Sequence, residues 1–436
     1  MLAGCVDWPE AEARRYRELG YWQSRTLGGE LRQWAARYGD RTALVGGGRR
    51  FTYLELDQWA DRLAAGLSAR GVKAGDRIVV QLPNVPEFVA LCFGLHRLGA
   101  LPVFALPAHR RNEIGHLGQI SEAVAYVVPD VHQGFDYRPL AKEISAEVPS
   151  IRETFVVGDP GPFAALADAE AEPAEFPDPD PADVAFFLLS GGTTALPKLI
   201  PRTHDDYAYQ VRTSAGICGL GEDGVYLAVL PLPFNFTWGC PGILGVLSCG
   251  GTAVLARNRG PDECFALIEA EKVTLTSIVP TIAHLWLDGL EWVDHDLSSL
   301  RLLQIGSAKL HEDVARRIEP AFGCSLQQVF GMAEGLLCMT RADDDAQTIA
   351  TTQGSAISPA DELRVVDPAG QQVPPGTPGE LLTRGPYTLR GYYRAPEHNR
   401  TAFDTAGFYR TGDLIRLTEA GNVVVEGRVK DRKSVV

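Results

Sequence analysis

An apolar run that opens into a loop of glycine and hydroxyl residues is the strongest chemical signal in this chain of 436 residues. The run FFLL at 186–189 is followed by SGGTTALPK, which extends from Ser190 to Lys198. Glycines let the backbone curl so that several N–H groups face one anion, while hydroxyl groups add donors and a lysine adds positive charge. The loop therefore suits the β- and γ-phosphates of a nucleotide. It is not a Walker A loop, because G-x-x-x-x-G-K-[ST] is absent.

Four further groups of residues follow the loop in a fixed order. They are VFGMAEG at 329–335, GEL at 379–381 with GYY at 391–393, YRTGDL at 409–414, and GRVKD at 427–431. Together with the loop they resemble, in order and spacing, the motifs of the acyl-adenylate-forming superfamily, which includes acyl-CoA synthetases, luciferases and the adenylation domains of nonribosomal peptide synthetases. The resemblance covers nearly the whole chain.

Within that superfamily, the chain is most similar to the stand-alone aryl acid adenylating enzymes, the 2,3-dihydroxybenzoate/salicylate–AMP ligases. The segments KLIPRTHDDY at 198–207 and ALPAHR at 105–110 carry this likeness, as does Ala333 in place of the usual Thr. The resemblance implies that ATP adenylates an aromatic 2-hydroxy carboxylic acid, with release of pyrophosphate. The aryl group then passes to the phosphopantetheine thiol of an aryl carrier protein in siderophore or nonribosomal peptide biosynthesis.

The resemblance also implies roles for single residues. Lys198 and Glu334 are the expected catalytic residues, and Glu334 would hold Mg²⁺, a hard cation that prefers oxygen ligands. Asp413 would accept hydrogen bonds from the ribose hydroxyls, Arg428 would add a contact nearby, and Lys430 would belong to the hinge. The expected ATP- and AMP-binding residues are Ser190, Gly191, Gly192, Thr193, Thr194, Lys198, Gly306, Ser307, Val329, Phe330, Gly331, Met332, Ala333, Glu334, Asp413 and Arg428.

The family's acid pocket corresponds to LPFNFTWGCPG at 232–242. Asn235 stands where domains that activate amino acids carry an Asp for the substrate ammonium. An Asn has no charge and can hydrogen-bond a neutral hydroxyl, so we expect a substrate with an ortho hydroxyl and no α-amino group. Cys240 replaces the Ser of the dihydroxybenzoate enzymes and resembles the salicylate-using members, although it could also merely fill space. The expected pocket residues are Phe234, Asn235, Phe236, Gly239, Cys240, Ala308 and Leu337.

The pocket loop departs from the family's pattern at three positions. Phe234 stands where this group usually has His, and Trp238 and Gly239 are also unusual. Because Gly239 removes a side chain, we expect that a bicyclic or heteroaromatic 2-hydroxy acid also remains possible.

A second departure concerns the end of the chain, which stops just past the hinge motif. The family has a further small C-terminal α+β domain, which carries the Lys that contacts the α-phosphate and the acid. We expect that this domain is missing and that adenylation by the chain alone is slow. Two alternatives stay open: an aryl-CoA ligase, and a fragment that binds ATP or acyl-AMP without turnover.

Helices and strands must alternate to position these residues. Thr52 and Glu55 form a capping box, and the following segments alternate as a strand at 77–82, a helix at 86–98 and a strand at 100–106. Strands recur at 225–230, 252–255, 275–279 and 302–305, which indicates parallel sheets with crossover helices. Short strands at 362–366, 379–383 and 423–425 indicate a small antiparallel unit.

We therefore expect an α/β fold with two doubly wound lobes and a small β-barrel-like subdomain. The expected divisions are 1–185 for the first lobe, 186–340 for the second lobe with the phosphate loop and acid pocket, 341–427 for the β subdomain, and 428–436 for the hinge and truncated end. The acidic, proline-rich stretch at 167–184 is expected to be a solvated loop.

Composition narrows the class further. Lys and Arg number 41 against 55 Asp and Glu, a net charge of −14, which disfavours nucleic acid and anionic membranes as partners. Neither a membrane-spanning run nor a signal-peptide core is recognisable. The eight cysteines include no CxxC pair, which is typical of reduced thiols in a cytoplasmic protein.

Overall fold

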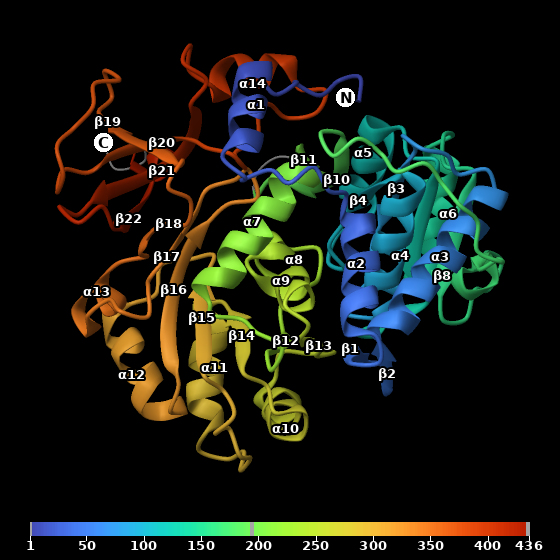
Figure 1. Cartoon of the computed structure of the whole chain (residues 1–436), viewed down its shortest axis with the longest axis horizontal. Helices are drawn as coiled ribbons and strands as arrows, with labels where there is room; N and C mark the ends of the chain where they lie inside the picture. Colours follow the sequence, from blue (N-terminus) through green and yellow to red (C-terminus); the bar gives the residue numbers. More distant parts are fainter. Residues whose placement is uncertain (1, 192–195, 433–436) are drawn as a thin grey trace.

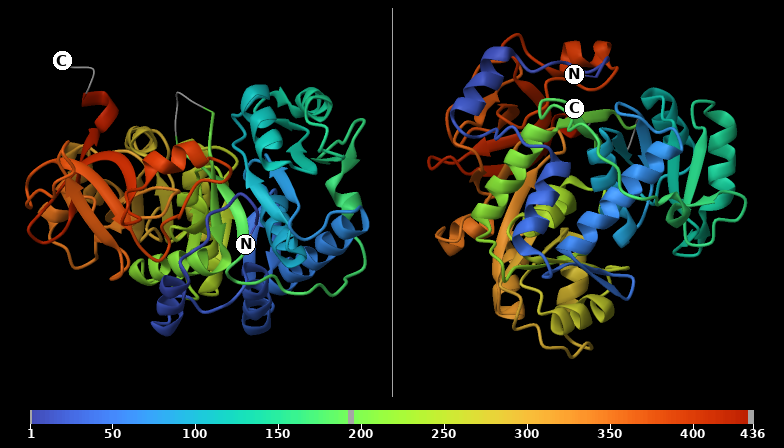
Figure 2. Two further views of the ribbon diagram at one scale, coloured as in Figure 1. Left: turned by 90° about the horizontal axis from the view of Figure 1, so that it is seen from above. Right: turned by 45° about the vertical axis from the view of Figure 1, so that its right-hand side comes forward.

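The computed structural model of the chain describes residues 2–191 and 196–432. Within these residues, a seven-stranded and a nine-stranded sheet form the body of the molecule, and a four-stranded sheet adjoins them (Figure 1). Figure 2 shows the four-stranded sheet at one end, the seven-stranded sheet at the other, and the nine-stranded sheet between them.

The seven-stranded sheet has the order β11-β10-β4-β3-β5-β8-β9 and is parallel except for the hairpin of β10 and β11. The strands are β3 (Arg77–Val80), β4 (Leu101–Phe104), β5 (Ala125–Pro129), β8 (Glu153–Val157), β9 (Ala164–Ala165), β10 (Val184–Leu189) and β11 (Leu199–Thr203). The helices of this part are α3 (Tyr53–Ala69), α4 (Pro86–Leu98), α5 (Arg111–Ser121) and α6 (Tyr137–Glu147), and a small hairpin joins β6 (Val131–His132) to β7 (Phe135–Asp136).

The nine-stranded sheet has the order β18-β17-β16-β15-β14-β12-β13-β1-β2, with a parallel centre and antiparallel edges. The strands are β1 (Thr42–Gly46), β2 (Arg49–Thr52), β12 (Val225–Ala228), β13 (Thr252–Leu255), β14 (Leu275–Ile278), β15 (Leu302–Gly306), β16 (Ser325–Gly331), β17 (Leu337–Met339) and β18 (Ser355–Ala356). The helices are α7 (His204–Ile217), α8 (Asn235–Gly239), α9 (Gly242–Ser248), α10 (Pro261–Glu271), α11 (Pro280–Gly289), α12 (Glu312–Phe322) and α13 (Ala346–Thr351).

The small sheet is antiparallel, in the order β19-β20-β21-β22. Its strands are β19 (Glu362–Val366), β20 (Gly379–Arg384), β21 (Tyr409–Leu417) and β22 (Val423–Arg428), with α14 (Pro396–Ala402) before β21 and α15 (Val429–Arg432) after β22. The expected antiparallel unit is confirmed. Among the described residues, however, β19 and β22 form two separate edges, so the sheet is open and not closed into a barrel.

The expected boundary between residues 185 and 186 does not follow the sheets. β1 and β2 come early in the chain but belong to the nine-stranded sheet, where β1 pairs with β13. β10 and β11 belong to the seven-stranded sheet, where β10 pairs with β4. Sheet membership crosses this expected division because strand pairing joins segments that are distant in sequence, and composition alone does not reveal such pairs.

The largest apolar core lies between the two large sheets. There α3 packs against α4, and α2 (Leu27–Tyr38) contacts both of these helices as well as α9. Trp238 is fully buried in this core, where its ring contacts the rings of Phe88, Phe93 and Phe104. Trp238 therefore binds the lobes together and does not line the acid pocket.

Local signals in the sequence placed several elements correctly. Thr52 caps α3 through the predicted box with Glu55. Pro86 begins α4, and Gly99, in the left-handed conformation, ends it. The acidic stretch at 167–184 contains only the end of a short 3-10 helix, Leu166–Ala169, before β10 begins. All eight cysteines are free, and no helix in the described residues is long and apolar enough to cross a membrane.

Candidate active site

A cavity of about 1310 Å³ lies where strands of both large sheets end and the small sheet adjoins them. Residues that follow the carboxyl ends of β4, β10, β15 and β16 line it, as do residues of β21 and β22. Ligands of open α/β sheets bind at this edge of the strands. The cavity is lined by these predicted residues: Ser190, Gly191, Lys198, Phe234, Asn235, Phe236, Cys240, Ser307, Ala308, Val329, Phe330, Gly331, Met332, Ala333, Glu334, Leu337, Asp413 and Arg428.

The base of the predicted phosphate loop is closed by two hydrogen bonds. The Ser190 backbone N–H donates to the Lys198 carbonyl at 3.0 Å, and the Lys198 N–H donates to Ser190 Oγ at 3.0 Å. The hairpin of β10 and β11 thus holds both ends of the loop at the cavity. Lys198 Nζ lies 5.5 Å from the centre of the Tyr392 ring, a cation–π contact that directs this charge into the same cavity. Gly192, Thr193 and Thr194 lie outside the described residues.

Glu334 and Asp413 are buried carboxyl groups on the side of the cavity next to the small sheet. Tyr392 donates its hydroxyl to Glu334 Oε1 at 2.7 Å and lies 2.8 Å from the Tyr409 hydroxyl. Burial raises the pKa of Glu334, and the bond from Tyr392 opposes that shift. Asp413 accepts a hydrogen bond from Arg428 across β21 and β22. Burial likewise raises the pKa of Asp413, against the effect of Arg428.

The donor set around Glu334 fits a magnesium ion held together with a nucleotide. The described part of the chain contains no group of three or more His, Cys, Asp or Glu side chains that could hold a metal by itself. Mg²⁺ usually binds through one or two carboxylates plus substrate phosphates, so a single carboxylate that lines a cavity with room for a nucleotide is the expected arrangement.

Asn235 is the first residue of α8, and its side-chain amide is fixed by three neighbours. Its Oδ1 accepts from the Tyr207 hydroxyl at 2.9 Å and from Gln210 Nε2 at 3.1 Å. Its Nδ2 donates to the Met332 carbonyl at 3.2 Å. Within the described residues, the second N–H of Nδ2 is left to donate to a ligand, because one amide nitrogen carries two hydrogens.

Cys240 is fully buried beside Asn235 and lines the cavity. Its thiol donates to the Asn235 carbonyl at 3.1 Å, and Gln210 Nε2 lies 3.5 Å from its sulfur. Burial raises the pKa of the Cys240 thiol far above its usual value, so the group stays protonated. The side chain therefore presents a weakly polar, unreactive surface to the pocket.

Three predicted residues lie outside the cavity wall. A Cβ on Gly239 would lie 2.5 Å from the Tyr207 hydroxyl, so the missing side chain makes room for Tyr207 and does not widen the pocket. A Cβ on Gly306 would lie 2.6 Å from the Val329 carbonyl, so this glycine allows close packing of β15 and β16. Lys430 is exposed on α15, next to the small sheet.

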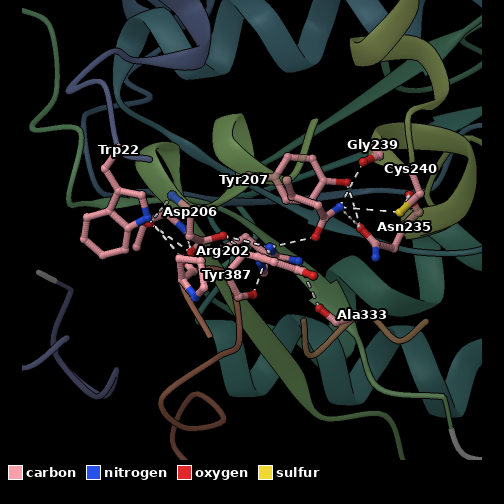
Figure 3. A network of polar contacts seen from close by, with 12 residues as sticks. Trp22, Arg202, Asp206, Tyr207, Asn235, Gly239, Cys240, Ala333 and Tyr387 are labelled. Carbon is pink, nitrogen blue, oxygen red and sulfur yellow. Dashed lines mark hydrogen bonds and ion pairs between the residues drawn. The ribbon is translucent and has the colours of Figure 1, made fainter. Parts of the chain in front are cut away.

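Gln210 and Arg202 are site residues whose roles the sequence did not reveal. Figure 3 shows Arg202 between Asp206, Ala333 and Tyr387, with Asn235, Gly239 and Cys240 on the far side of Tyr207. Arg202 has no exposed surface and donates to Asp206 at 2.8 Å, to the Ala333 carbonyl at 3.1 Å and to Gln210 Oε1 at 3.0 Å. Arg202 lies within the segment KLIPRTHDDY, but the two backbone carbonyls that it bonds, those of Ala333 and Tyr387, are more than a hundred residues away in the chain.

The described residues bring the two ends of the glycine-rich loop, two buried carboxyl groups and Asn235 to one cavity at the carboxyl edge of the strands, which is the arrangement expected of an adenylate-forming enzyme. The model of the AMP-binding enzyme family matches residues 31–393. This chain belongs to that family.

Individual relatives agree over almost the whole chain. A 2,3-dihydroxybenzoate-AMP ligase of Bacillus subtilis is 51% identical over 99% of this chain and 80% of its own length. A salicyl-AMP ligase / salicyl-S-ArCP synthetase of Mycobacterium tuberculosis is 49% identical over 99% of this chain and 78% of its own length. The apo structure of Mycobacterium smegmatis MbtA superposes with a TM-score of 0.93 at 45% identity, covering 98% of this chain and 80% of that one.

Proposed function

We propose that this chain uses ATP to adenylate an aromatic acid with an ortho hydroxyl, a salicylate-like acid, with release of pyrophosphate. The single observation that supports this best is the hydrogen bonding of the Asn235 side-chain amide. Its carbonyl oxygen is used within the protein, while one N–H is left to donate at the cavity wall. An ortho hydroxyl oxygen next to a carboxylate can accept that bond, whereas benzoate leaves the N–H unpaired.

The same cavity places the two reactants together. The acid carboxylate must attack the α-phosphate, and both are anions, so the site has to neutralise charge and hold the groups in line. Lys198 at the loop end and Lys309, three residues after β15, supply positive charge at the cavity wall. Asp413 keeps lone pairs beyond the bond from Arg428, because a carboxylate accepts about four hydrogen bonds, and the ribose hydroxyls would donate there.

Glu334 would hold Mg²⁺ beside the phosphates. When bound, the ion supplies charge that polarises the phosphoryl oxygens. Burial of Glu334 and its bond from Tyr392 keep that carboxylate in one orientation. An aryl carrier protein is the proposed acceptor of the acyl group, in keeping with the name of the mycobacterial relative, a salicyl-AMP ligase / salicyl-S-ArCP synthetase.

Binding of stable acyl-adenylate analogues tests this function. We expect salicyl-sulfamoyl adenosine to bind more tightly than benzoyl-sulfamoyl adenosine. The benzoyl analogue leaves the Asn235 N–H unpaired, which costs about 1–3 kcal/mol of binding free energy. Isothermal titration calorimetry on the unmodified chain gives both dissociation constants. Equal affinities would contradict the proposed role of Asn235. Acid-dependent ATP–pyrophosphate exchange with a panel of aryl acids then identifies which acid is activated. Assays with CoA or a carrier protein as the acyl acceptor distinguish the two possible acceptors.

A further inference from the structure

Gln210 lies between Arg202 and the acid pocket, and it has no exposed surface. Its side chain extends from α7. Its Oε1 accepts from Arg202 at 3.0 Å, while its Nε2 donates to Asn235 Oδ1 at 3.1 Å and to the Gly239 carbonyl at 3.0 Å. Both ends of this amide are thus engaged, one on each side of the pocket wall.

The polarity of these contacts follows from Arg202. A guanidinium donates hydrogen bonds and never accepts them, whereas an amide side chain can turn over and exchange its donor and acceptor. With Arg202 on one side, the Gln210 amide must present its oxygen there. The Gly239 carbonyl, which can only accept, selects the same orientation from the opposite side.

The fixed Gln210 amide in turn selects the orientation of Asn235. Gln210 Nε2 can only donate, so it requires Asn235 Oδ1 to face it. The Tyr207 hydroxyl could either donate or accept, so it does not select an orientation by itself. The Met332 carbonyl agrees with Gln210 by accepting from Nδ2. The remaining N–H of Asn235 is therefore a donor to the ligand, and not an acceptor.

We infer that Arg202, acting through Gln210, sets the polarity of the Asn235 amide, which makes Gln210 a specificity-determining positioning residue of the acid pocket. This inference rests on the proposed function. It assigns the pocket a requirement for an acceptor at the ortho position, which a hydroxyl oxygen meets and an ortho amino group meets poorly.

Gln210→Glu is the sharpest variant, because it keeps the size of the side chain and the acceptor for Arg202 but replaces the donor with an oxygen. Asn235 Oδ1 would then face a carboxylate oxygen, which favours the opposite orientation of its amide. We expect the ratio of benzoyl- to salicyl-sulfamoyl adenosine dissociation constants to fall about fivefold or more. The 2-aminobenzoyl analogue, which offers a donor, should improve relative to the salicyl analogue. Gln210→Met should also lower the ratio of the benzoyl to the salicyl dissociation constant, but it should not improve binding of the 2-aminobenzoyl analogue relative to the salicyl analogue.

Gln304 provides the matched control. It is also a fully buried glutamine, bonded through Nε2 to Gln327 at 2.8 Å and through Oε1 to the Ser277 hydroxyl at 2.6 Å, but neither of these partners lines the cavity, whereas the Gln210 partner Asn235 does. Gln304→Glu and Gln304→Met should destabilise the fold. They should leave unchanged the ratio of the benzoyl to the salicyl dissociation constant and the ratio of the 2-aminobenzoyl to the salicyl dissociation constant. Melting curves of all variants establish that each protein is folded at the temperature of the titrations.

The outcomes separate the inference from the function on which it rests. If the unmodified chain binds the salicyl and benzoyl analogues equally, the proposed role of Asn235 fails and the inference fails with it. If the unmodified chain discriminates and the folded Gln210→Glu variant discriminates to the same degree, only the inference is overturned. An equal loss of affinity for all three analogues would likewise assign Gln210 a purely structural role.

Discussion

The acid pocket and the nucleotide side of the cavity are held by different kinds of interaction. Around the acid pocket, Asn235 and Gln210 are neutral amides whose bonds have a fixed direction. On the nucleotide side, Glu334 and Asp413 are buried carboxyl groups, and a cation, Arg428, pairs with one of them. A neutral amide gains little net energy from each bond but is costly to leave unpaired, which makes it suited to discrimination. Charged groups interact more strongly but lose hydration when they are buried, which makes them suited to binding a charged ligand.

Arg202 contacts both regions, and its replacement should have the largest effect. Arg202→Met leaves Asp206 buried without its cation and removes donors from the Ala333 carbonyl and Gln210. Breaking a buried ion pair by removing one partner costs about 3–5 kcal/mol in the free energy of unfolding, measured by urea denaturation. The control Arg316→Met removes an exposed pair with Glu312 and should cost less than about 1 kcal/mol. Similar losses in the two variants would contradict the central position of Arg202.

Asp413→Asn tests the nucleotide side of the cavity alone. The ribose hydroxyls would lose a charge-assisted acceptor, so nucleotide affinity should fall by about 1.5–3 kcal/mol per bond in a calorimetric titration with ATP. Glu362→Gln, an exposed carboxylate of the same small sheet that pairs with Arg384, should leave the affinity unchanged. If Asp413→Asn bound ATP as tightly as the parent, with an intact melting curve, the ribose assignment would be wrong.

Asp361 makes the wall behind the acid pocket sensitive to pH. Burial raises the pKa of Asp361 to about 7, and its Oδ2 accepts from the Tyr387 hydroxyl, which in turn accepts from the N–H of Leu337 in the pocket wall. A carboxyl whose pKa is raised by folding stabilises the protein at pH values below the unfolded pKa, and this contribution is lost as pH rises through about 7.

The free energy of unfolding should therefore fall by about 2 kcal/mol from this group between pH 5 and pH 8. Asp361→Asn keeps an oxygen acceptor but cannot ionise, so its unfolding free energy should depend less on pH over that interval. Urea denaturation at several pH values measures both slopes. Parallel profiles for the parent and the variant would show that Asp361 titrates at its ordinary pKa.

Cys240→Ser changes the acid pocket and should have the smallest effect on binding. A serine hydroxyl can donate to the Asn235 carbonyl, as the thiol does, and still accept from a 3-hydroxyl on the ring, for which sulfur is a weak partner. The preference should shift toward the 2,3-dihydroxybenzoyl analogue by about 1 kcal/mol. An unchanged ratio of the dihydroxybenzoyl and salicyl dissociation constants would mean that Cys240 only fills space.

The sequence by itself determined the local elements and the motifs. Thr52 with Glu55, and Pro86 with Gly99, set the ends of helices through interactions between residues close in the chain, so α3 and α4 follow from the sequence alone. The order of the motifs likewise predicted a phosphate loop beside an acid pocket, and most of the described residues that were predicted for the site line one cavity.

Only the tertiary structure decided the partners of those elements. β1 pairs with β13, about two hundred residues further along the chain, and no local pattern specifies that pairing. Gly239 appeared in the sequence as added space in the pocket, but the space is taken by Tyr207 from α7.

The orientation of the Asn235 side-chain amide is also set by the tertiary structure. An asparagine offers a donor and an acceptor of nearly equal size, so its residue type leaves open which one faces the ligand. Arg202 and Gln210 select the donor because a guanidinium can only donate, and folding places them beside an α8 residue that follows them by some thirty positions.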